Sequence, residues 1–129
     1  MSEKFKVEVI TPDQTILQSD AIEVTIPSFE GQMGILKNHI PLITFLRPGI
    51  ILIKNNEVTR YYVEEGIVEF SNDNLLILTS TARDLKNFDR KLVDNLLAKA
   101  QNDLSNADKT DKEKYIESYK IDTLKELNQ

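Results

Sequence analysis

The chain has 129 residues, of which 40% are hydrophobic and 29% are charged, and it contains no cysteine. This length and composition predict one soluble globular domain, or one domain with an appendage, rather than a disordered chain. The lack of cysteine excludes disulfides, thiolate metal sites and cysteine catalysis. A net charge of −5 argues against nucleic acid or anionic lipid as the main partner, because phosphate binding draws on clustered Lys and Arg.

Neither a membrane span nor a targeting segment is evident in the sequence. The densest apolar run, Ile50–Ile53, is flanked by Gly49 and Lys54 and is far too short to cross a bilayer. The stretch from Met1 to Phe5 has no apolar signal core and no Arg/Ser-rich transit character. We therefore expect the protein to be made and used in the same soluble compartment.

The front part of the chain is predicted to consist of strands and turns. Apolar and polar residues alternate over 5–9 and again over 22–26, which is the pattern of half-buried strands, and Pro27 is expected to end the second. Turn residues at 48–49, 55–56 and 71–74 separate further apolar runs at 42–46, 50–54, 67–70 and 75–78. Roughly eight short strands at this spacing predict an antiparallel β-sandwich or flattened barrel.

The back part is predicted to be helical, because all prolines and glycines lie before residue 67. From Leu85 to Leu104, apolar residues recur at helical spacing over an arc of about 180°, whereas one packing partner requires only about 100°. We therefore expect this first helix to touch two surfaces.

A capping box, Thr110-x-x-Glu113, predicts where a second helix begins, because the hydroxyl and the carboxylate satisfy free backbone amides reciprocally. The apolar stripe of this helix is narrower, and Ile121 is expected to point away from it. The connection at 103–109 is polar and short, as an antiparallel helical hairpin requires.

Together these patterns predict an α+β fold, with a β-sandwich domain at 1–84 and a helical hairpin domain at 85–129. Helices of this length are marginally stable alone in water. We therefore expect the hairpin to dock on another surface.

The sequence offers no catalytic constellation. It has one histidine, His39, no Gly-Lys pair for a phosphate loop, and neither GxSxG nor HExxH. A zinc site would need mostly carboxylates, and no cluster indicates one. The pair Glu64-Glu65 would point to opposite faces of a strand. The chain is therefore expected to be no enzyme and to bind neither metal nor cofactor.

The stretch from Glu30 to Gly49 is the most distinctive part of the sequence. Gly31 and Gly34 permit a tight loop with positive φ. Within this loop, Phe29 and Met33 fit a contact surface and a cap on the sandwich equally well.

This stretch resembles the signature of the ε subunit of the rotary proton-translocating ATP synthase, which has an acidic Glu-Gly-x-x-Gly loop, then His-x-Pro and then Pro-Gly. The resemblance covers the whole chain, since that family also has a β-sandwich followed by a helical hairpin. It implies a non-catalytic central-stalk (rotor) subunit that couples the γ subunit to the membrane c-ring.

Carried over by motif position, the resemblance implies a c-ring contact at Glu30, Gly31, Gln32 and Met33, and a γ contact at His39, Ile40 and Leu42. The second acidic position of the family loop is Gln32 here, so a charge-based contact with the c-ring rests on Glu30. A neutral turn histidine bonded to the backbone is an equal alternative for His39. We expect Met33→Asp or Gly31→Val to weaken coupling without unfolding the protein.

The family's hairpin can also open and extend along γ into the catalytic head, where it blocks rotation. The resemblance therefore implies transient contact with the α and β subunits and inhibition of ATP hydrolysis. Some members bind regulatory ATP through Ile/Leu-Asp-x-x-Arg-Ala at the start of the first helix. Here Asp89 matches that motif, but Leu92 and Val93 replace Arg and Ala, which leaves Asp89 as a candidate nucleotide contact.

The resemblance also implies a location. The chain would reach the membrane only through the complex, as a peripheral subunit on the cytoplasmic side of the cell inner membrane or, in a plastid, on the stromal side of the thylakoid. An alternative is a free-standing β-sandwich binding module with a helical hairpin for dimerisation. A third interpretation is a nucleotide-binding sensor.

Overall fold

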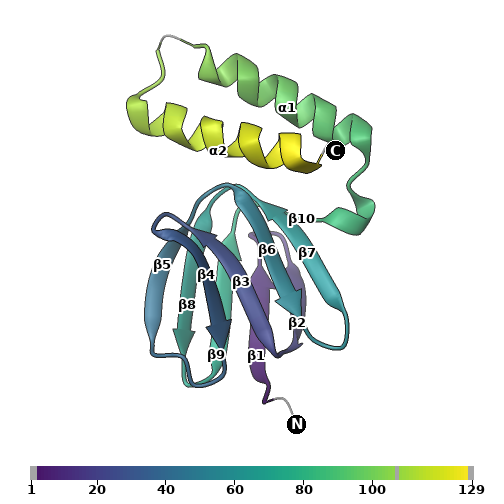
Figure 1. Ribbon diagram of the computed structural model, residues 1–129, viewed down its shortest axis with the longest axis vertical. Helices are drawn as coiled ribbons and strands as arrows, with labels where there is room; N and C mark the ends of the chain where they lie inside the picture. The colour runs from purple at the N-terminus through teal and green to yellow at the C-terminus, as the bar shows by residue number, and fades with distance from the viewer. Residues whose placement is uncertain (1–2, 107, 128–129) are drawn as a thin grey trace.

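A strand-rich body capped at one end by two helices makes up the computed structural model, which describes residues 3–106 and 108–127 (Figure 1). The remaining residues, which fall within the predicted ranges 1–84, 85–129 and 103–109, lie outside the described part. The predicted α+β fold, a β-sandwich followed by a helical hairpin, is confirmed.

The described strands outnumber the roughly eight expected from turn spacing. They are β1 (Phe5–Ile10), β2 (Thr15–Ala21), β3 (Glu23–Ser28), β4 (Gly31–Leu36), β5 (Leu42–Leu46), β6 (Gly49–Lys54), β7 (Val58–Val63), β8 (Gly66–Ser71), β9 (Asn74–Thr79) and β10 (Ala82–Asp84). A 3₁₀ turn, η1 (Leu85–Asn87), leads into α1 (Arg90–Leu104) and α2 (Asp111–Leu127).

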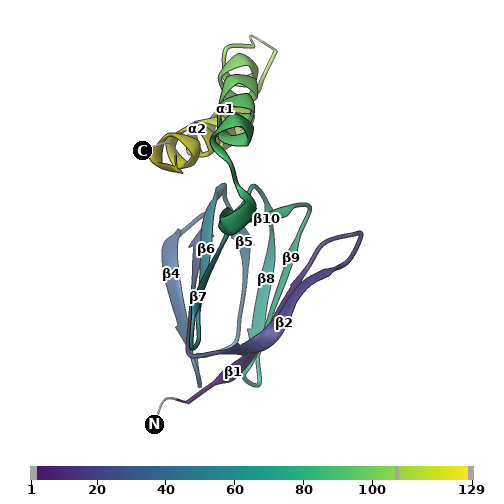
Figure 2. The ribbon, with the colours of Figure 1, turned by 90° about the vertical axis from the view of Figure 1, so that its right-hand side faces the viewer.

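The strands form one continuous sheet, in the order β10-β7-β6-β3-β5-β8-β9-β1-β2, with β4 paired to β3. The sheet curls into two facing layers (Figure 2). It turns at β3, which pairs with β6 through Glu23–Thr25 and with β5 only where Ser28 meets Leu46. The pairs are antiparallel except for β1 and β9, which run parallel.

Two local expectations need correction. Pro27 does not end its strand, because β3 continues to Ser28, and the Pro27 carbonyl accepts a hydrogen bond from Arg47 N at 2.9 Å. The expected loop at Gly31–Gly34 is instead the first part of β4, paired with β3 along its length. A proline loses only its donor, so it can still stay in a strand whose carbonyl finds a partner.

The core lies between the two layers, because alternate residues of each strand point inward. In β1, for example, Val7 and Val9 are fully buried whereas Lys6 is exposed. Phe70 is 1% exposed and meets the Phe5 ring edge-on, with ring centroids 5.6 Å apart. Burying one such side chain contributes about 1.5–3 kcal/mol, so this layer of side chains dominates the stability of the sandwich.

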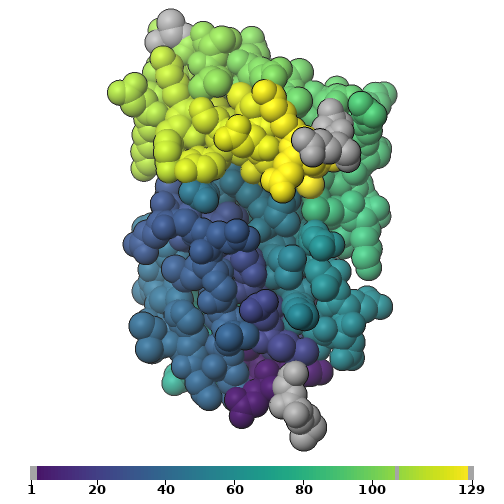
Figure 3. Space-filling model, viewed as in Figure 1, coloured from purple at the N-terminus to yellow at the C-terminus, as the bar shows by residue number. Residues whose placement is uncertain are grey.

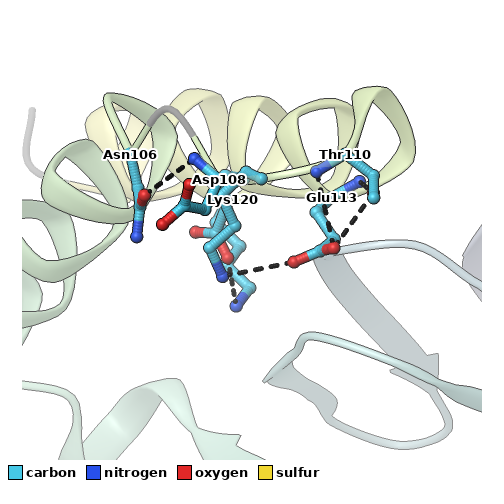
Figure 4. Close-up of polar contacts among 7 residues, drawn as sticks. Asn106, Asp108, Thr110, Glu113 and Lys120 are labelled. Atoms are coloured by element: carbon cyan, nitrogen blue, oxygen red, sulfur yellow. Dashed lines mark hydrogen bonds and ion pairs between the residues drawn. The ribbon is translucent and has the colours of Figure 1, made fainter.

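Both helices begin at side-chain caps. The Asp89 carboxylate accepts a hydrogen bond from Leu92 N at 2.8 Å at the start of α1. At the start of α2, Thr110 Oγ1 accepts from Glu113 N at 3.1 Å, and Glu113 Oε1 accepts from Thr110 N at 3.5 Å (Figure 4). The predicted capping box is therefore confirmed.

Ile121, predicted to point away from the apolar stripe of the second helix, is nevertheless buried, as are Glu117 and Leu124 on the same helix. The cause is the position of α2, which lies between α1 and the sandwich (Figure 1) and is therefore covered from two sides. In the space-filling view the hairpin sits directly on one end of the sandwich (Figure 3).

Candidate functional site

The turn between β3 and β4 lies at the end of the sandwich that carries the hairpin (Figure 1). It consists of Phe29 and Glu30, and Ser28 fixes it: Ser28 Oγ donates to Gly31 O at 2.7 Å and accepts from Glu30 N at 3.2 Å. Gly31 has a φ of 122°, a backbone conformation that residues other than glycine adopt only with strain. Phe29 N donates to Phe45 O at 3.1 Å. The turn is therefore a rigid feature, with the Glu30 side chain exposed.

The residues expected to contact the c-ring differ in the exposure of their side chains. Glu30 and Gln32 are exposed, whereas Met33 is half-buried and packs against the core of the sandwich. Met33→Asp would place a charge against that core, and Gly31→Val would force a branched side chain into positive φ. Contrary to our expectation, both variants would disturb the fold, so Glu30 and Gln32 are the sites at which the contact can be tested.

His39 lies in the connection between β4 and β5, at the opposite end of the sandwich. Its Nδ1 donates to the Ile40 carbonyl at 2.7 Å, because a carbonyl can only accept. Its ring meets Phe70 edge-on, with centroids 5.9 Å apart, and Asn38 N donates to Asp73 Oδ1 at 2.8 Å. This is the geometry of a turn histidine bonded to the backbone. The γ contact of His39 stays a prediction.

The two groups of expected contact residues are thus not brought together. The Phe29–Glu30 turn precedes β4 and the His39 connection follows it, so the length of that strand separates them. Leu42, at the start of β5, is half-buried and packs against the core, whereas Ile40 is 74% exposed. Separate contacts for the two groups of residues are compatible with this arrangement.

An exposed apolar face on β5, β8 and β9 was missed by sequence reasoning. Phe45 pairs with Ile67, which pairs with Leu78, and these side chains are 58%, 43% and 41% exposed. Ile43, two residues before Phe45, is 72% exposed. The sequence signal was present: Leu42–Leu46 is apolar at positions that point both inward and outward. An exposed patch of this kind is typical of an interaction surface.

Next to this apolar face, a cleft of about 1050 Å³ opens between the sandwich and α2. Phe45, Ile67 and Leu78 line it from the sandwich, and Ile116 and Lys120 line it from α2. The apolar face therefore continues up to the hairpin.

A polar cluster joins α2 to the sandwich beside the cleft. Lys120 Nζ lies 3.2 Å from Glu117 Oε1 and 3.8 Å from Glu64 Oε1. Tyr62 donates its hydroxyl to Glu64 Oε2 at 2.9 Å. Burial, followed by the neighbouring Glu64 carboxylate, raises the pKa of Tyr62, so the hydroxyl stays protonated and can donate. One lysine thus bridges carboxylates on the helix and on the sandwich.

An apolar cluster supports the other end of the interface. Tyr62 of β7, Val93 of α1 and Leu124 of α2 are buried together, with Leu85 and Phe88 packed against them. The Tyr62 and Phe88 rings stack with centroids 5.6 Å apart. Val93 of α1 thus belongs to one buried cluster with Leu124 of α2 and Tyr62 of the sandwich.

The candidate nucleotide contact, Asp89, has a structural role in this chain, because its carboxylate caps α1. Within the described residues, no group of three or more His, Cys, Asp or Glu side chains is placed to hold a metal ion. None of the described helices is both long and apolar enough to span a bilayer.

Known proteins are similar to this chain in sequence. Residues 4–84 match the family described as ATP synthase, Delta/Epsilon chain, beta-sandwich domain. The ATP synthase epsilon chain of Pelagibacter ubique is 50% identical over 131 residues, covering 99% of this chain and all of that protein. The chloroplastic epsilon chain of Pylaiella littoralis is 41% identical over 110 residues, covering 84% of this chain and 83% of that one.

Solved structures of ATP synthases contain chains with the same fold. A chain of the Euglena gracilis mitochondrial enzyme (OSCP/F1/c-ring) superposes with a TM-score of 0.76 at 21% identity, over 96% of this chain and 79% of that one. A chain of the Tetrahymena thermophila enzyme (central stalk/c-ring) gives 0.66 at 16% identity, over 99% and 98%. The family match and the full-length relatives together show that the chain belongs to the ATP synthase epsilon chain family.

Proposed function

We propose that the chain is a non-catalytic subunit of the central stalk, the rotor, of a proton-translocating ATP synthase. Its relationship to epsilon chains over nearly the whole length supports this function most directly. As in its family, the chain would couple the γ subunit to the c-ring and would reach the membrane only as a peripheral part of the complex. The location would be the cytoplasmic side of the inner membrane in a bacterium or the stromal side of the thylakoid in a plastid.

The proposed γ contact comprises the exposed apolar face together with His39, Ile40 and Leu42. The apolar row Phe45–Ile67–Leu78 would otherwise remain in water, at a cost of about 25 cal/mol per Å² of apolar surface. Covering this row with a partner removes that cost, which is the physical reason to place the larger interface here.

The proposed c-ring contact is the Phe29–Glu30 turn with the adjoining Gly31, Gln32 and Met33. Glu30 supplies the charge, Gln32 supplies hydrogen-bonding groups, and the serine-fixed turn holds them in place. Met33 would contribute indirectly, because its side chain packs against the core and anchors β4. A rigid support of this kind suits a contact that must transmit torque.

The proposed role of the hairpin is that of a brake on ATP hydrolysis, exerted when α1 and α2 leave the sandwich and meet the α and β subunits of the catalytic head. The hairpin is docked in this structure. Only the open form would inhibit ATP hydrolysis, so the strength of the brake depends on the population of the open form.

The γ contact is tested by titrating the purified full-length chain against the purified γ subunit. We expect Phe45→Asp to weaken binding by at least about tenfold, because it removes an aromatic side chain from the apolar patch and would bury an unpaired carboxylate in the interface. Val58→Asp is the matched control, since Val58 is an apolar residue with 38% exposure on β7, away from this face. Equal effects of both substitutions, or no complex with γ at all, would contradict the assignment.

The c-ring contact is tested in membranes from which the chain has been stripped and then restored. Glu30→Lys should reduce ATP-driven proton pumping relative to ATP hydrolysis, while Glu57→Lys, an exposed charge reversal in the turn between β6 and β7, should leave the ratio unchanged. A free-standing binding module would neither bind these membranes nor alter pumping.

A further inference from the structure

The first half of α2 rests on the sandwich through a continuous stack of side chains. The Phe29 and Tyr115 rings lie nearly parallel, with an interplanar angle of 18° and centroids 6.3 Å apart. Tyr115 meets Tyr119 edge-on at 4.7 Å, and their hydroxyl oxygens are 2.9 Å apart. Arg47 closes the stack: its guanidinium carbon lies 4.3 Å from the centre of the Tyr119 ring, and Nη1 donates to Tyr119 Oη at 2.9 Å.

The two ends of this stack belong to the sandwich and the two middle members to the hairpin. Both ends are held in place by backbone hydrogen bonds: Phe29 N donates to Phe45 O at 3.1 Å, and Arg47 N donates to Pro27 O at 2.9 Å. The tyrosines therefore dock against groups that are already positioned, so less conformational freedom is lost on contact.

The hydrogen bonds of the stack form a consistent chain. Arg47 can only donate, so Tyr119 Oη accepts from it and can donate its own hydrogen to Tyr115 Oη. The hydrogen bond with Tyr115 raises the pKa of Tyr119, so this hydroxyl is protonated at neutral pH. A guanidinium over an aromatic face adds a cation–π attraction.

The stack is placed to resist rotation of the hairpin. The chain enters the hairpin through η1, which lies on the opposite side of the molecule from the β3–β4 turn (Figure 1). We call η1 the hinge. The apolar cluster contains Leu85 and Phe88 and therefore lies beside the hinge, whereas the stack holds α2 over the β3–β4 turn. A contact far from the hinge opposes a swinging motion more effectively than one beside it.

We propose that Phe29, Tyr115, Tyr119 and Arg47 form a latch that keeps the hairpin docked, and that opening the latch lets the half of the hairpin farther from the hinge swing off the sandwich. Phe29 neighbours Glu30, so a partner that displaces the Phe29 ring also opens the latch. The use of the latch to control inhibition rests on the proposed brake function, whereas the latch itself belongs to the chain alone.

The latch is tested by measuring one distance in the isolated full-length chain. Because the sequence has no cysteine, cysteines introduced at the exposed positions Lys37 and Asn102 carry spin labels at those sites only. We expect one narrow distance distribution in the parent chain. Tyr119→Leu or Arg47→Met should raise the population at longer distances by at least about tenfold, the effect of losing a charge-assisted hydrogen bond and a cation–π contact.

The matched control is Ser118→Ala, which lies between the two tyrosines and bonds only to the Lys114 carbonyl of its own helix. The double variant of Arg47 and Tyr119 should open the hairpin no further than Tyr119→Leu alone, because that change already removes the contact with Arg47. Amide hydrogen exchange in β1 and β9 reports whether the sandwich stays folded. If Tyr119→Leu lowers that protection, Phe29→Ala is used in its place. This substitution changes an exposed turn residue and removes the other end of the stack.

Unchanged distances in the Tyr119, Arg47 and Phe29 variants, with the sandwich protected, would overturn the latch. The brake is judged separately in the assembled enzyme, where Tyr119→Leu should lower ATP hydrolysis relative to Ser118→Ala. Release of the hairpin without a change in hydrolysis would contradict the brake and still support the latch.

Discussion

The sandwich and the hairpin are stabilised in different ways. The sandwich has its own core, in which strands distant in sequence, such as β1 and β9, are paired and bury residues like Val7 and Ile77 completely. The described part of the hairpin buries few apolar side chains, namely Val93, Ala100, Ile121 and Leu124. An element with so little core of its own depends on docking. The difference fits a rigid body that carries a releasable arm.

The largest effect is expected from truncating the core of the sandwich. Phe70→Ala removes a ring that is 1% exposed and contacts the Phe5 ring, and it should lower the free energy of unfolding by about 3–5 kcal/mol. Urea denaturation followed by far-ultraviolet circular dichroism measures this loss. A loss below about 1 kcal/mol, the range of surface substitutions, would show that this layer does not dominate stability.

A truncation of similar size in the hairpin should weaken the docking of the hairpin and leave the sandwich folded. Leu124→Ala removes a fully buried side chain from the apolar cluster beside the hinge and should weaken docking by about 2–5 kcal/mol. Amide hydrogen exchange should show faster exchange in α1 and α2, with little change in β1 and β9. Equal losses in both regions would mean that residues 1–84 and 85–129 unfold as one unit and not as separate domains.

A smaller effect is expected at the start of α1. Asp89→Ala removes the cap on Leu92 N and should cost about 0.5–2 kcal/mol of helix stability. Asp89→Asn should restore most of it, because asparagine caps equally well. The same pair of variants addresses regulatory ATP: if ATP raised the melting temperature of the parent chain but not of Asp89→Asn, Asp89 would be a nucleotide contact as well as a cap.

The smallest effect is expected from acid at the start of α2. The hydrogen bonds from the side chain and backbone of Thr110 hold the pKa of Glu113 below its ordinary value of 4.5. The capping box therefore contributes stability above that ordinary value, and this contribution is lost as the pH falls through the lowered pKa. The Glu113 carboxyl titration followed by NMR should move upward in Thr110→Ala. An unchanged titration would show that the box does not form in solution.

The sequence predicted those features that arise from local patterns. Alternation over residues 5–9 indicated β1, and Thr110 with Glu113 indicated where α2 begins, because each signal lies within a few residues. What was missed depends on contacts between distant segments. Ile121 is buried because α2 is covered on two sides, and no periodicity within α2 reveals a second cover.

The candidate site was predictable only in part. The motif located Glu30 and His39, but it did not indicate that Gly31–Leu36 would be a strand or that Met33 would face the core. The stack joins Arg47 to Tyr119, 72 positions away, and no local pattern in the sequence indicates such a contact. The exposed face around Phe45 could have been found from the apolar run at Leu42–Leu46.

The most direct test of the rotor function is to restore the chain to membranes that have lost it and to measure ATP-driven proton pumping. The parent chain should return pumping to the level of untreated membranes, and Phe45→Asp should fail to do so while Val58→Asp succeeds. Pumping that is the same with and without the chain would contradict its role as the coupling between the stalk and the ring.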